Sequence, residues 1–217
     1  MAMNLSEIKS MPCNKANYPP GSTEPIKYIV IHYTAGTNDT ARANGVYFSR
    51  LTVQASAHYF VDDNEVIRTV EDCDSAWHCG AKTYTHPECR NSNSIGIEMC
   101  SRLSGGVYSI SDETVRRTVD LAKTLMRKYN IPAENVIRHF DVTGKRCPEP
   151  FVRIPALWDD FKERISAPVH DYASVNDIVW ELANRKIITN KELWLEKLEQ
   201  DVNAYWLARK MCLYLCR

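Results

Sequence analysis

The chain has 217 residues, a hydrophobic fraction of 44% and a charged fraction of 25%. These ordinary globular values exclude a fibrous or wholly disordered protein, and the length allows one domain with an appendage or two small domains. Lysine plus arginine and aspartate plus glutamate both number 27, so the formal net charge is zero. A protein that neutralises nucleic-acid phosphates needs a basic excess, so we expect no nucleic-acid partner. No run reaches the roughly 18 apolar residues of a membrane span, so we expect no stable membrane insertion.

The chain up to residue 26 is polar and rich in turn residues, which predicts a lead-in loop. Beyond it, apolar and β-branched runs predict strands at 26–34, 56–63, 65–70, 94–100 and 135–142. The second and third strands are expected to meet at a tight turn, Asp63-Asn64.

Helical patterns lie between these strands and after the last of them. They predict helices from Thr40 to about Leu51, from a Ser111 cap to about Tyr129, and over 154–165. Strands that alternate with helices predict an α/β fold, a central mixed sheet covered by helices.

The sequence changes character near residue 166. We expect a first domain at 1–166, a linker at 167–173 (beginning at Ser166 or just after it) and a small all-α module at 174–217. Helix-start signals at Ser174 and Thr189 predict short helices at about 175–185, 190–198 and 201–215.

Two of the six histidines lie near the ends of predicted buried strands. These are His32 and His139, and Cys147 follows on a loop. Burying a histidine is costly unless hydrogen bonds or a metal occupy its nitrogens, and two imidazoles with a thiol form a set that zinc accepts. On spacing alone, ordinary packing remains the more frequent explanation. His58, in a strand of alternating character, is expected to be a hydrogen-bonded core residue.

Five segments carry a family resemblance when read in order: IVIHYTAG, SAHYFV, AWHCGA, NSIGIEMC and HFDVTGKRCPEP. Together they resemble the zinc-dependent N-acetylmuramoyl-L-alanine amidases of the type-2 amidase family, which includes phage endolysins, bacterial autolysins and peptidoglycan-recognition proteins. The resemblance covers roughly residues 24–166 and implies the type-2 amidase fold. It implies zinc ligands at His32, His139 and Cys147, and hydrolysis of the amide between N-acetylmuramic acid and L-alanine in peptidoglycan.

The same resemblance implies two catalytic residues. Glu98 matches the base that takes a proton from water and passes it to the leaving amine. Some relatives place a tyrosine on the SAHY strand for this task, but Ala57 stands here, which leaves the work to Glu98. Lys145 matches a cation near the substrate carbonyl, against the alternative of a solvated loop lysine. Asp141 is either an acceptor that orients a ligand histidine or a turn residue.

Trp77 and His78 match the family's substrate-cleft dipeptide, with core packing as the alternative for Trp77. A second zinc site is not expected, because its candidate ligands are irregularly spaced and lack a CxxC pair: Cys73, Cys79, His86 and Cys89. A disulfide between Cys79 and Cys89 after release from the cell stays open, as does the redox state of Cys73.

The resemblance favours a phage or prophage endolysin of a Gram-positive host that lyses the bacterial cell wall. The N-terminus lacks an apolar stretch of signal-peptide length, so we expect the protein in the host cytoplasm until its release. The alternatives are a host autolysin of growth or sporulation and a non-catalytic peptidoglycan-binding protein; the presence of Cys147 and Glu98 disfavours the latter. For the C-terminal module, wall binding is preferred, and homodimer formation or capping of the catalytic domain stays open.

Overall fold

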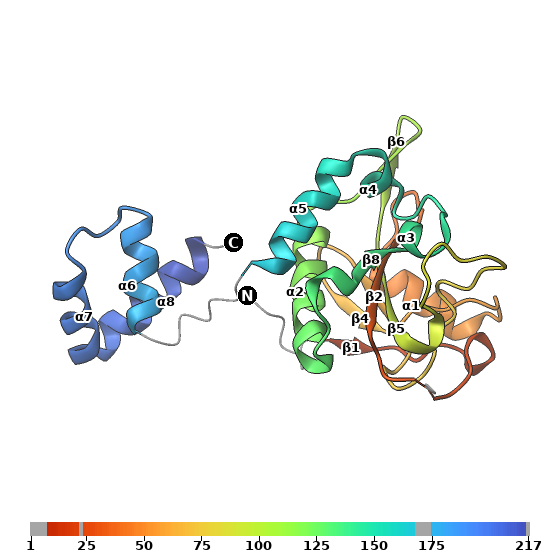
Figure 1. The fold of residues 1–217 in the computed structure, drawn as a ribbon, viewed down its shortest axis with the longest axis horizontal. Coiled ribbons are helices and arrows are strands. Elements are labelled where there is room, and N and C mark those ends of the chain that lie inside the picture. The colour runs from red at the N-terminus through yellow and green to blue at the C-terminus, as the bar shows by residue number, and fades with distance from the viewer. Residues whose placement is uncertain (1–7, 22–23, 168–174, 216–217) are drawn as a thin grey trace. The chain divides into compact units, whose positions relative to one another are not determined.

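The computed structural model describes residues 8–21, 24–167 and 175–215. The chain divides into two compact units, Ala2–Ala167 and Pro168–Arg217 (Figure 1). Most of the linker predicted at 167–173 lies outside the described residues, and Ser166 still belongs to the last helix of the first unit. No helix in the described part of the chain is both long and apolar enough to cross a membrane.

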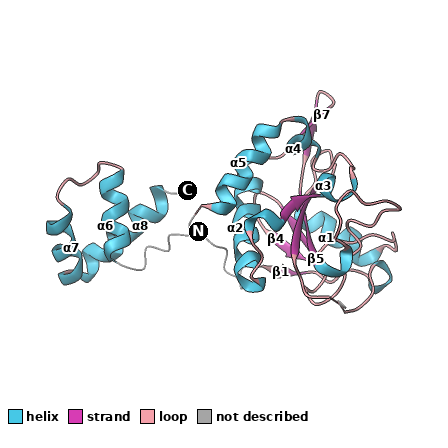
Figure 2. Cartoon of the chain, viewed as in Figure 1, coloured by secondary structure: helices cyan, strands magenta, loops and turns pink. Residues whose placement is uncertain are grey.

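A six-stranded mixed sheet forms the centre of the larger unit (Figure 2). Its order is β1-β4-β3-β5-β2-β8, and only the β3–β4 pair is antiparallel. The strands are β1 (Lys9–Ser10), β2 (Tyr28–Tyr33), β3 (Tyr59–Val61), β4 (Val66–Arg68), β5 (Ser94–Met99) and β8 (Val136–Arg138). The α/β class predicted from the alternating pattern is therefore confirmed.

The two central strands are buried on both faces, as their continuous apolar runs predict. On β2, Ile29 and Ile31 join the main core, whereas Tyr28 and Val30 pack in a second cluster on the opposite face. β2 pairs with β5 along its whole length, from Tyr28 beside Ser94 to Tyr33 beside Met99. This extended parallel pairing aligns the carboxyl ends of both strands.

Helices cover the two faces of the sheet (Figure 1). Helix α1 (Ala41–Arg50) begins at the predicted cap Thr40 and packs against β3 and β4. Helix α2 (Asp112–Tyr129), capped by Ser111 as predicted, packs with α5 (Pro155–Ser166) over the main core.

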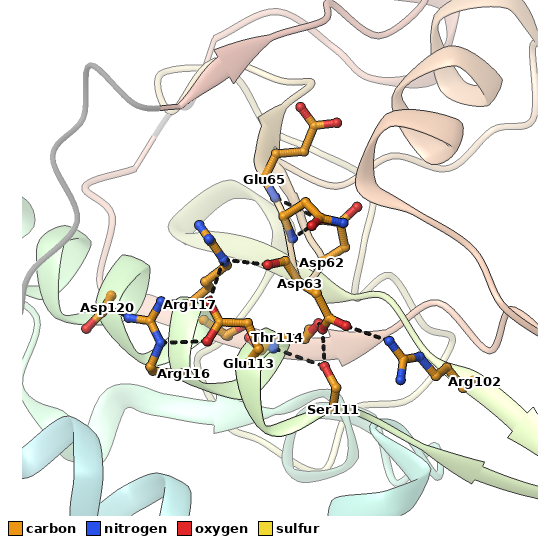
Figure 3. A network of polar contacts seen from close by, with 12 residues as sticks. Asp62, Asp63, Glu65, Arg102, Ser111, Glu113, Thr114, Arg116, Arg117 and Asp120 are labelled. Atoms are coloured by element: carbon orange, nitrogen blue, oxygen red, sulfur yellow. Dashed lines mark hydrogen bonds and ion pairs between the residues drawn. The ribbon is translucent and has the colours of Figure 1, made fainter. Parts of the chain in front are cut away.

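The turn between β3 and β4 anchors the start of α2 (Figure 3). The carboxylate of Asp63 accepts hydrogen bonds from the hydroxyls of Ser111 and Thr114 and forms an ion pair with Arg102. Its neighbour Asp62 accepts from the backbone N–H of Ala41, at the first turn of α1. The tight turn therefore ties both helices to the sheet.

The predicted strand at 135–142 is wrong beyond Arg138. The chain turns there into helix α3 (His139–Thr143), so His139 is the first residue of a helix rather than the end of a strand. The Asp141 carboxylate accepts from the backbone N–H of Arg138 at 2.8 Å, and such a local side-chain bond competes with continuation of a strand.

Other elements lie where no strand or helix was predicted. The lead-in segment contains β1 and a short 3-10 helix (Lys15–Asn17). β1 pairs with β4, a partner that the local sequence pattern does not show. A hairpin of β6 (Arg102–Ser104) and β7 (Val107–Ser109) turns at two glycines of positive φ, and α4 (Glu149–Arg153) follows Pro148.

The smaller unit contains α6 (Val175–Asn184), α7 (Lys191–Gln200) and α8 (Val202–Leu215), close to the predicted helices. Asn190 rather than Thr189 caps α7, because its side chain accepts from the backbone N–H of Leu193. The predicted start at Ser174 lies outside the described residues. Buried apolar side chains form the unit's own core: Ile178, Val179, Leu182, Ile188, Leu198, Ala208 and Cys212.

Candidate metal and active site

Three buried side chains from separate segments meet at one end of the sheet. His32 lies near the end of β2, His139 begins α3, and Cys147 lies on the loop that follows α3. Their candidate ligand atoms all lie within 4.8 Å of one another. The backbone N–H of Phe140 donates to the carbonyl of Cys147 at 2.8 Å, which ties the loop back onto α3.

Burial keeps both imidazoles neutral. It lowers the pKa of His32 well below its usual value, and the neighbouring His139 and His78 lower it further. Burial, together with the charge of Lys145, lowers the pKa of His139 to about 4. Neutral imidazole is the form that binds metals, so both rings have the required protonation state at neutral pH.

Burial acts in the opposite direction on the thiol. It raises the pKa of Cys147 to about 12, nearby Glu98 adds to this, and a hydrogen bond from the backbone of Tyr33 lowers it. The group therefore stays a thiol unless a cation arrives, and metal binding releases its proton.

A polar atom without a partner tests whether a metal fits here. The Nδ1 atom of His139 is buried and has no hydrogen-bond partner among the described residues. An unsatisfied buried polar group costs roughly 1–3 kcal/mol, and a metal ion would remove that cost. With two imidazoles and one thiol around it, the arrangement fits zinc.

Glu98 lies beside this group. It is the register partner of His32 on β5, and its Oε1 is 3.9 Å from His32 Nδ1. The side chain is 20% exposed, and its Oε2 has no hydrogen-bond partner within the described chain. Burial raises the pKa of Glu98 to about 8; Lys145 lowers it and Asp39 raises it further. A carboxyl group of this kind can exchange protons near neutral pH.

A cavity of about 750 Å³ opens beside the group. His139 and the exposed Lys145 line it together with Trp77 and His78, whereas His32, Cys147 and Glu98 are not among its lining residues. The remaining lining residues are Gln54, Ala55, Gly80, Ala81, Thr83, Asn91, Thr143 and Gly144.

Trp77 and His78 differ in how they are held. Trp77 is 38% exposed, so it is not a fully buried core residue, and its contact with substrate stays a prediction. His78 is half-buried, and both of its ring nitrogens have partners: Nδ1 lies 3.0 Å from His32 Nε2, and Nε2 lies 3.1 Å from the hydroxyl of Ser94. The sequence predicts a substrate contact for His78 and gives no sign of this contact with a candidate ligand.

Two further predictions have clear outcomes. His58 is a hydrogen-bonded core histidine, as expected: its Nδ1 accepts from the N–H of Gly96, and its Nε2 lies 3.1 Å from the carbonyl of Asp74. Both carboxylate oxygens of Asp141 accept from Arg138, so Asp141 caps α3 and does not orient a histidine. Cys79 and Cys89 are buried free thiols in this structure.

Known proteins resemble this chain in both sequence and fold. The sequence profile of the family described as N-acetylmuramoyl-L-alanine amidase (Amidase_2) matches residues 22–150. The amidase BlyA of Bacillus subtilis (strain 168) is 34% identical over 178 residues, which cover 76% of this chain and 48% of BlyA. A probable N-acetylmuramoyl-L-alanine amidase of Bacillus licheniformis is 31% identical over 71% of this chain and 45% of its own length. The chain therefore spans about half the length of these curated relatives.

Solved structures extend the likeness to the fold. The catalytic domain of XlyA, an amidase of Bacillus subtilis, has a TM-score of 0.62 at 29% identity, covering 73% of this chain and 99% of that domain. The structure of PlyL has a TM-score of 0.63 at 28% identity, covering 76% of this chain and 99% of PlyL. The chain belongs to the N-acetylmuramoyl-L-alanine amidase family.

Proposed function

We propose that this protein hydrolyses the amide bond between N-acetylmuramic acid and L-alanine in peptidoglycan, with zinc held by His32, His139 and Cys147. The observation that carries the proposal is the meeting of these three side chains next to Glu98, in a chain that belongs to this family. Relatives named as N-acetylmuramoyl-L-alanine amidases support the choice of bond.

An amide is a weak electrophile, so hydrolysis needs an activated water and a stabilised oxyanion. Zinc at this site would lower the pKa of a water molecule to about 7 and polarise the carbonyl. Glu98 accepts the proton of the attacking water and delivers it to the leaving amine. Zinc held nearby would favour the ionised carboxylate and lower the pKa of Glu98 from about 8 toward the range of a working base.

Two residues on the cavity wall act on the substrate. Lys145 is exposed there, and its positive charge stabilises the oxyanion that develops on the scissile carbonyl. Trp77 presents a partly exposed indole, against which a sugar ring or stem peptide packs.

The wider role is that of an endolysin, which stays in the host cytoplasm until release and then lyses the cell wall. The solved structure of a mutant endolysin from Bacillus subtilis, 29% identical with a TM-score of 0.62, supports this over the alternative of a host autolysin. In this arrangement residues 1–166 are the catalytic domain, 167–173 the linker, and 174–217 a wall-binding module, with homodimer formation as the other use of the module.

Metal analysis and product analysis together test the proposal. The purified full chain should contain about one zinc per molecule, and Cys147→Ser should lose it. Cys100→Ala, another buried cysteine of the same unit, is the matched control and should keep it. Mass spectrometry of digested peptidoglycan should show stem peptides with a free L-alanine amine and glycan with intact lactyl groups. Cleavage within the glycan or within the stem peptide would contradict the assigned bond.

A further inference from the structure

His78 contacts His32 on the side of the ring away from Cys147. We propose that His78 is a positioning residue: it holds the imidazole of His32 so that Nδ1 faces the metal, and Ser94 holds His78 in turn. This inference rests on the proposed zinc site.

The two nitrogens of His32 have separate surroundings. Nδ1 lies 3.7 Å from the sulfur of Cys147, whereas Nε2 lies 3.0 Å from Nδ1 of His78. A neutral imidazole has one N–H and one lone pair. If Nδ1 offers its lone pair to the metal, Nε2 carries the hydrogen and donates it to His78.

The hydrogen bond at the Ser94 end of this chain requires the same placement of hydrogens on the two rings. The hydroxyl of Ser94 donates to the backbone carbonyl of Arg90 at 2.6 Å, and a carbonyl can only accept. The hydroxyl oxygen is then free to accept from Nε2 of His78, 3.1 Å away. With its hydrogen on Nε2, His78 can only accept at Nδ1. The hydrogen between the two rings must therefore come from Nε2 of His32. One backbone oxygen therefore determines the tautomers of both rings.

Close packing fixes the position of the His78 ring. A Cβ atom at Gly96 of β5 would lie 2.5 Å from Cγ of His78, so only glycine leaves room for the ring against the strand. The backbone N–H of His78 also donates to the side chain of Asn91 at 3.2 Å. Both ring nitrogens of His78 are engaged in this chain of hydrogen bonds, which gives the ring a role toward His32. His78 also lines the cavity, so the substrate contact expected for it stays a prediction.

Zinc affinity of the full-length protein, measured by competition with a chelator, tests the role. His78→Phe keeps an aromatic ring near Gly96 but removes the acceptor for His32, and we expect roughly 10- to 100-fold weaker zinc binding. His78→Asn, whose amide oxygen can take the place of Nδ1, should recover part of the loss. His86→Phe makes the same change in the same loop, where Nδ1 of the ring accepts from the backbone N–H groups of Glu88 and Cys89, and should leave zinc affinity unchanged.

Two more conservative variants keep the test decisive if His78→Phe does not fold. Gly96→Ala should weaken zinc binding by displacing the His78 ring, and Ser94→Ala should weaken it by a smaller factor. Wild-type affinity in both, with a normal thermal melting temperature, would overturn the proposal.

Nitrogen NMR of the metal-free chain separates this inference from the proposed function. The His32 ring should carry its hydrogen on Nε2 in the wild type and lose this preference in His78→Phe. A hydrogen on Nδ1 in the wild type would also overturn the proposal. If the wild type contained no zinc, the proposed function would fail, whereas the tautomer measurement would still report on the pair of rings.

Discussion

His32 and Glu98 are partners in register on the adjacent parallel strands β2 and β5, with 3.9 Å between Nδ1 and Oε1. Parallel strands point their carboxyl ends to the same edge of a sheet, and this edge is where functional residues of open α/β sheets gather. The pairing of β2 with β5 therefore places a candidate metal ligand beside the candidate base. The short distance also means that changes at Glu98 must be tested for their effect on metal binding as well as on turnover.

Glu98→Gln should lower turnover by roughly 100-fold or more, because the amide cannot take a proton from water. Zinc content and the circular dichroism spectrum should match those of the wild type. Release of stem peptides from purified cell walls measures the change. A wild-type rate would remove Glu98 from the mechanism.

The same variant should stabilise the metal-free protein in mild alkali. The pKa of Glu98 is raised to about 8 in the folded chain against about 4.5 in the unfolded chain. The folded state therefore keeps a proton that the unfolded state has lost, and the stability from this group disappears as the pH rises through 8. The neutral side chain of Glu98→Gln has no such loss, so its advantage in the free energy of unfolding should grow between pH 5 and pH 8. Urea unfolding at several pH values checks this, and parallel curves would contradict it.

Lys145→Ala should reduce kcat far more than it changes KM, since the charge acts on the oxyanion rather than on the bound substrate. Lys145→Arg keeps the charge and should recover part of the rate. The control is Lys82→Ala, which removes an exposed lysine that does not line the cavity. A soluble muropeptide is the appropriate substrate, and equal rates for Lys145→Ala and the control would refute the role.

His58 should make the metal-free protein less stable in acid. Burial lowers the pKa of His58 to about 3 in the folded chain, against 6.5 for the ordinary residue. Between these values the unfolded chain binds a proton that the folded chain does not, so stability falls as the pH drops below 6.5. The loss from this group is about 1.4 kcal/mol per pH unit. Urea unfolding between pH 7 and pH 5 measures this loss. In His58→Gln the free energy of unfolding should fall less steeply with pH than in the wild type, by the equivalent of one proton, even if the variant is less stable at pH 7.

A chain cut after Ala167 should fold, bind zinc and cleave soluble muropeptide. Every element of the six-stranded sheet and every candidate catalytic residue lies before the cut, and residues 175–215 have a core of their own. On intact cell walls the shortened chain should be slower if the helical module raises the local concentration of enzyme. Equal loss on both substrates would reject targeting, and a change from dimer to monomer would indicate an assembly role.

Local patterns in the sequence were sufficient for most regular elements, but not for β1, the β6–β7 hairpin, α3 or α4. The apolar runs at 26–34 and 94–100 predicted the two central strands found at 28–33 and 94–99, because a strand buried on both faces needs apolar side chains at every position. Thr40 and Ser111 predicted helix starts, because their side chains satisfy backbone N–H groups within the same turn. These interactions span a few residues, so they are visible without the fold.

The sequence and the family resemblance predicted only part of the site. The family resemblance placed His32, His139 and Cys147 together in advance, but it did not show that His139 begins a helix or that Asp141 is held by Arg138. It also did not show that His78 contacts His32, although Gly96 in a buried strand indicates a close approach of some kind.

The sequence by itself determined the α/β class, most of the elements and the residue types of the site. The tertiary structure decided which nitrogen of His32 faces the sulfur, which ring contacts its other nitrogen, and how far the pKa of Glu98 rises. The physical reason is the distance along the chain between interacting residues. The patterns of the central strands and of the helix caps involve residues that are close in sequence. The orientation of the His32 ring depends on His78 and Cys147, which are 46 and 115 residues away along the chain. The burial of Glu98 likewise depends on segments that come together only when the sheet forms.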